Sequence, residues 1–105
     1  MKKSREEILK AIKQTLAAIS PDARIILFGS QARGEARNGS DWDLLVILDK
    51  ARIELSDFDS ISYPIFELGL KEGEHFSTKL YTQTEWKKRS FTQFYKNIEQ
   101  EGIVL

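Results

Sequence analysis

A single apolar run, from Trp42 to Leu48, limits the folds open to this chain more than any other segment. Every residue from Leu44 to Leu48 is apolar, and Asp49 and Lys50 close the run. A strand with one solvated face alternates apolar and polar residues, whereas a strand covered on both faces is apolar almost throughout. The sequence therefore predicts a central β-strand over residues 42–48 that is buried on both faces.

The residues before this strand predict a helix and another strand. Ser4 and Glu7 have the spacing of an S-x-x-E capping box. Apolar residues then recur at helical spacing, at Ile8, Leu9, Ile12, Leu16 and Ile19. We expect this helix to end before Pro21. The β-branched and aromatic run from Arg24 to Phe28 predicts a strand that enters a tight turn at Gly29.

The second half of the chain predicts a further strand between helices. Residues 56–70 have helical periodicity, but Pro64 removes a backbone donor and should kink or split the helix, which Gly73 then stops. Residues 76–81 predict a strand with Ser77, Lys79 and Tyr81 on one face. Thr82 with Glu85 opens a short helix, and residues 91–100 predict another that ends at Gly102. We expect one domain over residues 1–105, of the α/β or α+β class.

Composition and charge exclude several classes of protein. The 16 Lys and Arg residues balance 16 Asp and Glu residues, so the chain lacks the net positive charge typical of nucleic-acid binding. The chain has no cysteine, which excludes disulfides and thiolate metal sites. The N-terminus lacks an apolar signal core, and no apolar run approaches the roughly 20 residues of a membrane span. We expect a cytoplasmic protein that does not associate with membranes.

Two carboxylates, Asp41 and Asp43, stand where the buried strand begins. Side chains at i and i+2 of a strand point to the same face, so the two acids should lie side by side. Two like charges this close disfavour joint ionisation unless a cation or hydrogen-bond donors lie between them. Mg²⁺ takes one or two protein carboxylates and completes its octahedron with waters and substrate phosphates. At the end of the preceding strand, Gly29 and Ser30 form a turn whose backbone suits close approach of phosphate oxygens.

The stretch GSQARG, from Gly29 to Gly34, followed by SDWDL, from Ser40 to Leu44, resembles the signature of the nucleotidyltransferase superfamily related to DNA polymerase beta. In its small size the chain is similar to the minimal nucleotidyltransferases that serve as antitoxins. The resemblance implies a mixed sheet of three or more strands backed by helices. It also implies ATP or another nucleoside triphosphate as donor, Mg²⁺ in a one- or two-metal site, and transfer of a nucleoside monophosphate to an acceptor.

The resemblance also implies roles for particular residues. Asp41 and Asp43 would be the catalytic and metal-binding carboxylates, and Ser30 would contact the triphosphate. Gly29, Arg33 and Ser40 belong to the same motif and are the other expected nucleotide-binding residues. Arg33 would neutralise phosphate charge or pair with a carboxylate of the turn.

The sequence departs from the family pattern at a third carboxylate that active members carry on a neighbouring strand. The strand over residues 76–81 contains no Asp or Glu, and neither Glu67 nor Glu74 stands at the expected position. Ser77 is the best candidate for the replaced residue. Without this acid the chain would be a slow enzyme, would take an acid from its partner, or would bind nucleotide without chemistry.

Simpler interpretations remain for several of these residues. Asp41 and Ser40 would serve equally to shape a turn, and Arg33 and Arg37 would serve as solvated loop charges. Trp42 should point away from the acids and pack in the core. His75 has no neighbouring acid or cysteine that indicates a site, and it is expected on the surface or at the end of a strand. The aromatic residues of the C-terminal part either complete the core or form a protein interface, namely Trp86, Phe91, Phe94 and Tyr95.

The leading hypothesis is a Mg²⁺-dependent nucleotidyltransferase that moves AMP from ATP to a protein acceptor. The resemblance implies that it is the antitoxin of a pair whose other member is a helical ribonuclease of the HEPN type. The alternative is a catalytically impaired module that binds nucleotide or protein and neutralises its partner by occlusion. Transfer to a small molecule fits less well, since 105 residues leave little chain for a second acceptor-binding domain. The sequence leaves the acceptor, the preferred base and homo-oligomer formation open.

Overall fold

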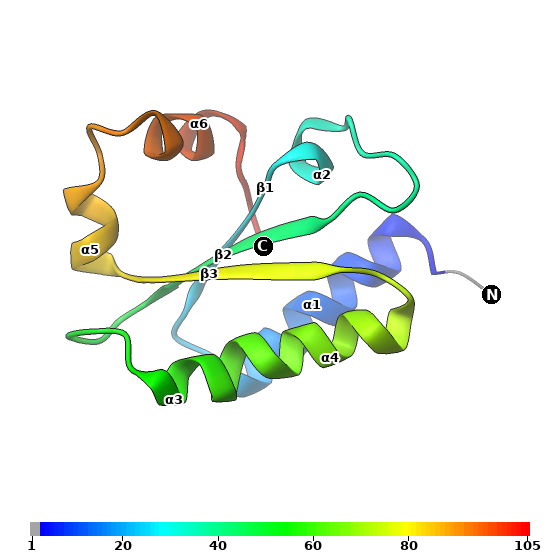
Figure 1. Ribbon diagram of the computed structural model, residues 1–105, viewed down its shortest axis with the longest axis horizontal. Helices are drawn as coiled ribbons and strands as arrows, with labels where there is room; N and C mark the ends of the chain where they lie inside the picture. Colours follow the sequence, from blue (N-terminus) through cyan, green and yellow to red (C-terminus); the bar gives the residue numbers. More distant parts are fainter. Residues whose placement is uncertain (1–2) are drawn as a thin grey trace.

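The computed structural model describes residues 3–105; Met1 and Lys2, the first residues of the predicted domain, lie outside the described residues. The strands are β1 (Arg24–Phe28), β2 (Trp42–Leu48), β3 (Phe76–Thr82) and β4 (Ile103–Val104). The helices are α1 (Arg5–Ile19), α2 (Ser30–Arg33), α3 (Leu55–Asp57), α4 (Tyr63–Glu72), α5 (Gln83–Lys88) and α6 (Gln93–Glu101), with a π-helical turn η1 (Phe58–Ser62) between α3 and α4. Helices cover both faces of one sheet (Figure 1), so the predicted α/β class is confirmed.

The four strands form a mixed sheet in the order β3-β2-β1-β4. β1 pairs antiparallel with both β2 and β4, whereas β2 and β3 are parallel. β2 is therefore a central strand, as its apolar run predicts. The expectation of a mixed sheet of three or more strands is confirmed.

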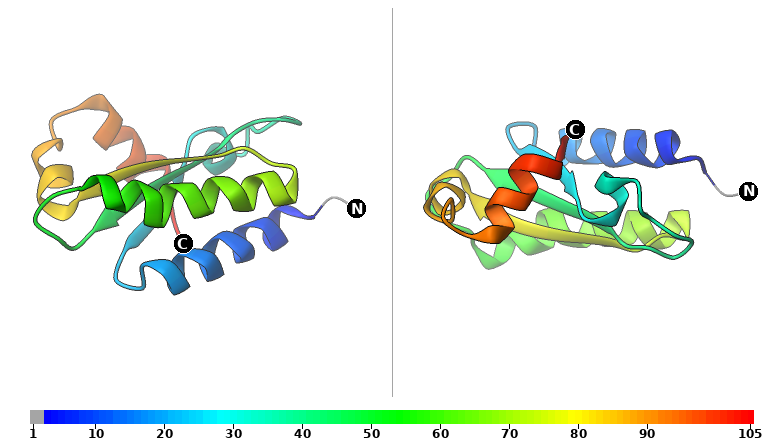
Figure 2. Two further views of the ribbon diagram at one scale, coloured as in Figure 1. Left: turned by 60° about the horizontal axis from the view of Figure 1, so that its bottom comes forward. Right: turned by 90° about the horizontal axis from the view of Figure 1, so that it is seen from above.

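Each face of the sheet has its own core. On one face α1 and α4 lie side by side (Figure 2), and they pack on alternate residues of β1 and β2 such as Leu27, Leu44 and Val46. On the other face, Trp86 of α5 and Ile98 of α6 pack on residues of the opposite parity, Ile26, Leu45 and Ile47. The two cores account for the nearly unbroken apolar sequence of β2.

The predicted helix starts and stops lie close to the observed ones. The Ser4 capping box is formed, and α1 ends at Ile19, before Pro21. The Thr82 capping box opens α5 in the same way. The predicted break near Pro64 takes the form of the η1 turn, after which Pro64 occupies the first turn of α4, where its missing N–H costs no helical hydrogen bond. Gly73 ends α4 with φ +70°.

Two short elements were not predicted. The four residues after Gly29 form helix α2, and the two residues after Gly102 form the edge strand β4. Both are too short to carry a periodic pattern in the sequence. Among residues 3–105, no helix combines the length and the apolar character that crossing a membrane requires.

Candidate functional site

Gly29 lies directly against the carboxylate of Asp43. β1 and β2 pair so that Phe28 stands opposite Asp43, and Gly29 is the next residue along the chain. Gly29 has φ +76° and ψ −158°, a region that is essentially restricted to glycine. A Cβ at this position would overlap Oδ2 of Asp43. The structure therefore brings the glycine-serine turn and the second acid together, as the motif requires.

Arg5 and Gln31 link helix α1 to the short helix that follows the turn. Nη1 of Arg5 donates a hydrogen bond to Oε1 of the buried Gln31 at 3.1 Å. The guanidinium of Arg5 also lies 5.7 Å from the ring centroid of Trp42. Trp42 is 3% exposed on the sheet face opposite the acids, so its predicted packing role is confirmed.

Asp41 precedes β2 and lies close enough to Asp43 for the two charges to interact, but the surroundings of the two acids differ. Asp41 is exposed, whereas Asp43 is half-buried. Nδ1 of His75 lies 2.9 Å from Oδ1 of Asp41, and both side chains are more than half exposed. His75 is exposed at the start of β3, as expected, but the expectation that no acid forms a site with it was wrong. The contact follows from the strand register. Trp42 pairs with Phe76, so the residues that precede them, Asp41 and His75, lie next to each other.

The ionised form of Asp43 is disfavoured in this structure. Burial raises the pKa of Asp43, and the neighbouring Asp41 raises it further by repulsion; the positive charges of Lys79, Arg33 and His75 act in the opposite direction. A cation between the two carboxylates would remove the repulsion and compensate for the burial. The electrostatics of the pair thus suit a divalent ion.

The donor set determines which ion the pair suits. No group of three or more His, Cys, Asp or Glu side chains within residues 3–105 is arranged to hold a metal. Two carboxylates beside a turn without a Cβ nevertheless match Mg²⁺, which binds few protein oxygens and takes the remainder from water and phosphate. The residues present therefore fit a Mg²⁺ ion whose coordination a nucleotide completes.

Ser77 lies beside Asp43, at the position proposed for the missing carboxylate. β2 and β3 run parallel with Asp43 paired to Ser77, so both side chains share a face. β3 has the sequence FSTKLYT and contains no acid. Glu67 lies within α4, and Glu74 lies in the connection before β3. Lys79 follows on the same face, and its Nζ is 6.0 Å from the ring centroid of Phe94.

Arg33 forms ion pairs with two carboxylates. Its Nε lies 2.6 Å from Oε1 of Glu35, and its Nη1 lies 3.3 Å from Oε2 of Glu101 in α6. Both hydrogen bonds raise the pKa of Arg33, with Glu35 the larger cause. Two roles were considered for Arg33, and the structure shows one of them, the ion pair with a nearby carboxylate, Glu35. The sequence did not indicate the second ion pair, with Glu101 of α6.

Ser40 shapes the loop before Asp41. Its hydroxyl oxygen accepts a hydrogen bond from the backbone N–H of Arg37 at 2.8 Å, and its own N–H donates to the carbonyl of Arg37 at 2.9 Å. Arg37 itself is exposed. These contacts match the turn-shaping interpretation, and a contact of Ser40 with nucleotide stays a prediction.

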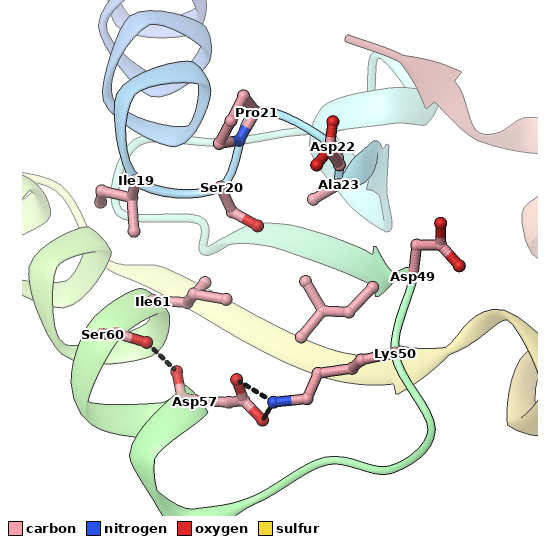
Figure 3. Close-up of a pocket in the computed structure, with 11 residues that line it drawn as sticks. Ile19, Ser20, Pro21, Asp22, Ala23, Asp49, Lys50, Asp57, Ser60 and Ile61 are labelled. Carbon is pink, nitrogen blue, oxygen red and sulfur yellow. Dashed lines mark hydrogen bonds and ion pairs between the residues drawn. The ribbon is translucent and has the colours of Figure 1, made fainter.

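A hollow of about 270 Å³ lies at the opposite end of β2 (Figure 3). Its basic side chain, Lys50, lies 2.9 Å from Asp57 and 3.2 Å from Glu54, so its charge is balanced. The hollow is separated from Asp43 by the remaining length of β2. We assign it no part in the site.

The C-terminal aromatic residues divide between the core and the surface. Trp86 is 3% exposed, and its ring centroid lies 4.8 Å from that of Tyr95 and 5.9 Å from that of Phe94. Phe91, by contrast, is 78% exposed. Most of these residues therefore complete the second core, and Phe91 remains available on the surface.

The mixed sheet, the turn at Gly29 and the paired acids together define a nucleotidyltransferase fold. The chain belongs to the nucleotidyltransferase domain family, whose model matches residues 6–105. This assignment confirms the resemblance identified in the sequence, and the chain is thus a member of a family of nucleotidyltransferase enzymes.

Two proteins with similar sequences carry names that agree with this family assignment. The chain is 34% identical over 101 residues to a protein of Methanocaldococcus jannaschii named "putative protein adenylyltransferase", covering 91% of this chain and 95% of that protein. A second protein of that organism with the same type of name is 31% identical over 102 residues, covering 92% and 94%.

Two solved structures share the fold. One is titled as a putative nucleotidyltransferase of Sulfolobus solfataricus, with a TM-score of 0.62, 20% identity, and coverage of 93% of this chain and 76% of that chain. The other is a chain of a toxin–antitoxin structure with AMP-PNP, with a TM-score of 0.59, 17% identity, and coverage of 96% and 72%. At these identities the similarity supports the fold alone.

Proposed function

We propose that this chain is a Mg²⁺-dependent adenylyltransferase that moves AMP from ATP to a hydroxyl side chain of a protein. Asp41 and Asp43 hold the metal, and the turn of Gly29 and Ser30 contacts the triphosphate. When bound, Mg²⁺ neutralises charge on the phosphate oxygens and fixes their positions. The contact of Gly29 with Asp43 carries the proposal, because it places a turn that admits phosphate beside an acid pair that favours a cation.

The chemistry is a displacement at the α-phosphorus. The acceptor oxygen bonds to this phosphorus, the bond to the bridging oxygen of the β-phosphate breaks, and pyrophosphate leaves. The hydroxyl proton must pass to a base. Since Ser77 stands where a carboxylate would do this, the proton goes to water or to an acid of the acceptor protein. We therefore expect slow turnover, as each 1.36 kcal/mol of barrier is tenfold in rate.

The nature of the acceptor and the partner is inferred from relatives. The two Methanocaldococcus proteins are named for transfer to protein, which supports a protein acceptor here. A chain of a solved toxin–antitoxin structure has the same fold, which supports the antitoxin role, and we propose a helical HEPN-type protein as the partner. The charge balance and the absence of cysteine are compatible with the cytoplasm as the place of action.

A transfer assay tests this proposal. The chain is purified together with the proteins that bind it and is incubated with Mg²⁺ and ATP labelled at the α-phosphate. We expect label on a hydroxyl side chain of a bound protein, loss of labelling with Asp43→Asn, and retention with Asp49→Asn. Asp49 is a matched control because it is an exposed acid at the other end of β2. A bound partner that the wild type leaves unlabelled would contradict the proposal.

One observation favours a second candidate function, neutralisation of a partner by occlusion. β3 carries no acid beside Asp43, and a site with two carboxylates lacks a residue that supplies base catalysis. The two candidates differ in their dependence on the acids. If the double variant Asp41→Asn, Asp43→Asn neutralises a co-purified ribonuclease as well as the wild type does, binding alone is sufficient and occlusion is the function.

A further inference from the structure

A hollow of about 340 Å³ opens between α2 and α6, on the sheet face that carries the two acids. Both helices lie over this face in the two figures (Figures 1 and 2). Gly29 belongs both to the acid site and to the wall of the hollow. The hollow is also lined by Phe28, Arg33, Phe94, Asn97 and Glu101.

The walls of the hollow are aromatic and amide in character. Phe28 and Phe94 meet edge to face, with ring centroids 5.5 Å apart. Asn97 is exposed on α6, and its Oδ1 accepts a hydrogen bond from Nε2 of Gln93 at 2.8 Å, which orients the amide. Aromatic walls with one amide suit a flat heterocycle, whose faces are apolar and whose edge carries donors and acceptors.

Charge at the hollow argues against a second phosphate site. Arg33 is the cationic side chain that lines the hollow. Its charge is balanced by two ion pairs, from Nε to Oε1 of Glu35 at 2.6 Å and from Nη1 to Oε2 of Glu101 at 3.3 Å. A polyphosphate would have to displace two carboxylates from Arg33 or face Glu101 directly. A neutral ring meets no such repulsion.

The position of the hollow relative to the acids matches the layout of a nucleotide. Phe28 lines the hollow and is the cross-strand partner of Asp43, so the hollow begins next to the second acid. A triphosphate held at Gly29 and Asp43 therefore has the hollow within reach of its nucleoside end. The volume lies near the lower end of the range of about 300–1,000 Å³ for small-molecule pockets.

We propose that the hollow between α2 and α6 receives the nucleobase of the triphosphate, with Asn97 hydrogen-bonded to the edge of the base and Phe28 and Phe94 against its face. This inference rests on the proposed function, because it assumes that the phosphates bind at Gly29 and Asp43. The Arg33–Glu101 ion pair joins the two helices that form the walls, which makes both residues positioning residues for this subsite.

Calorimetric titration of the full chain with two ligands tests the proposal. One ligand is ATP and the other is inorganic tripolyphosphate, which carries the phosphates without a base, both in the presence of Mg²⁺. The test variant is Asn97→Leu, which keeps the side-chain size and removes the hydrogen bonds. The matched control is Gln100→Leu, since Gln100 is exposed on the same helix and does not line the hollow.

We expect Asn97→Leu to weaken ATP binding about fivefold, the effect of one lost hydrogen bond, and to leave tripolyphosphate binding unchanged. Gln100→Leu should bind both ligands as the wild type does. ATP binding that Asn97→Leu does not alter, or equal losses for both ligands, would overturn the base subsite and leave the proposed function in place. A wild type that binds neither ligand would overturn both. If Asn97→Leu does not fold, Asn97→Ala has the same expected results.

Discussion

Replacing Gly29 by alanine tests the contact that builds the site. Gly29 occupies a backbone region essentially restricted to glycine, and an alanine there costs about 1–3 kcal/mol in the free energy of unfolding. The added Cβ would also overlap Oδ2 of Asp43 and force that carboxylate to move. Gly29→Ala should therefore lower stability by the backbone strain plus the cost of displacing Asp43.

Two comparisons separate these contributions. Gly34 also has a positive φ, +74°, but a Cβ there would meet nothing within 4 Å, so Gly34→Ala should cost only about 1–2 kcal/mol of left-handed strain. In an Asp43→Ala background the overlapping oxygen is gone. The cost of Gly29→Ala should then fall by about 0.5–3 kcal/mol, the range of couplings for residues in contact.

A double-mutant cycle measures this coupling, by urea unfolding of the wild type, Gly29→Ala, Asp43→Ala and the double variant. Thermal unfolding provides a check, because a loss of 1 kcal/mol lowers the melting temperature by about 4–8 °C in a domain of this size. ATP binding should be lost in Gly29→Ala and retained in Gly34→Ala. An equal cost of Gly29→Ala in the presence and in the absence of the Asp43 carboxylate would refute the inferred contact.

Further predictions concern the acids and their neighbour Ser77. Asp43→Asn should stabilise the metal-free protein at pH 7, because burial and Asp41 disfavour the ionised carboxylate; chemical denaturation measures this, and a destabilised variant would contradict it. Since the pKa of Asp43 is raised in the folded state, its contribution to stability is full below the unfolded pKa and is lost as pH rises through the folded pKa. The stability advantage of Asp43→Asn should therefore grow with pH over that window, and Asp41→Asn should lower the pKa of Asp43 in a carboxyl NMR titration. Ser77→Asp should increase labelling of the acceptor about tenfold or more by restoring an acid beside Asp43, whereas Ser77→Asn should not.

Local sequence signals predicted most of the secondary structure. Helices α1 and α5 begin at capping boxes, which involve residues three positions apart, and Gly73 ends α4 with the positive φ that favours glycine. The apolar run of β2 indicated a central strand because both faces had to be buried. In each case the cause lies within a few residues of the pattern.

The contacts at the site depend on strand register and helix placement, which a single sequence does not reveal. The contact of Asp41 with His75 and the pairing of Asp43 with Ser77 both follow from the parallel alignment of β2 with β3. The ion pair between Arg33 and Glu101 requires that α6 return over the sheet beside α2. The motif identified the acids and the turn, whereas their neighbours emerged only from the three-dimensional arrangement.

The most direct test of the account is a crystal structure of the chain with Mg²⁺ and a non-hydrolysable ATP analogue. We predict a cation about 2.0–2.1 Å from carboxylate oxygens of Asp41 and Asp43, with phosphate oxygens against Gly29 and Ser30. Asp41 would then turn toward the ion and away from His75. A nucleotide bound elsewhere on the chain, with no cation between the two acids, would contradict the account.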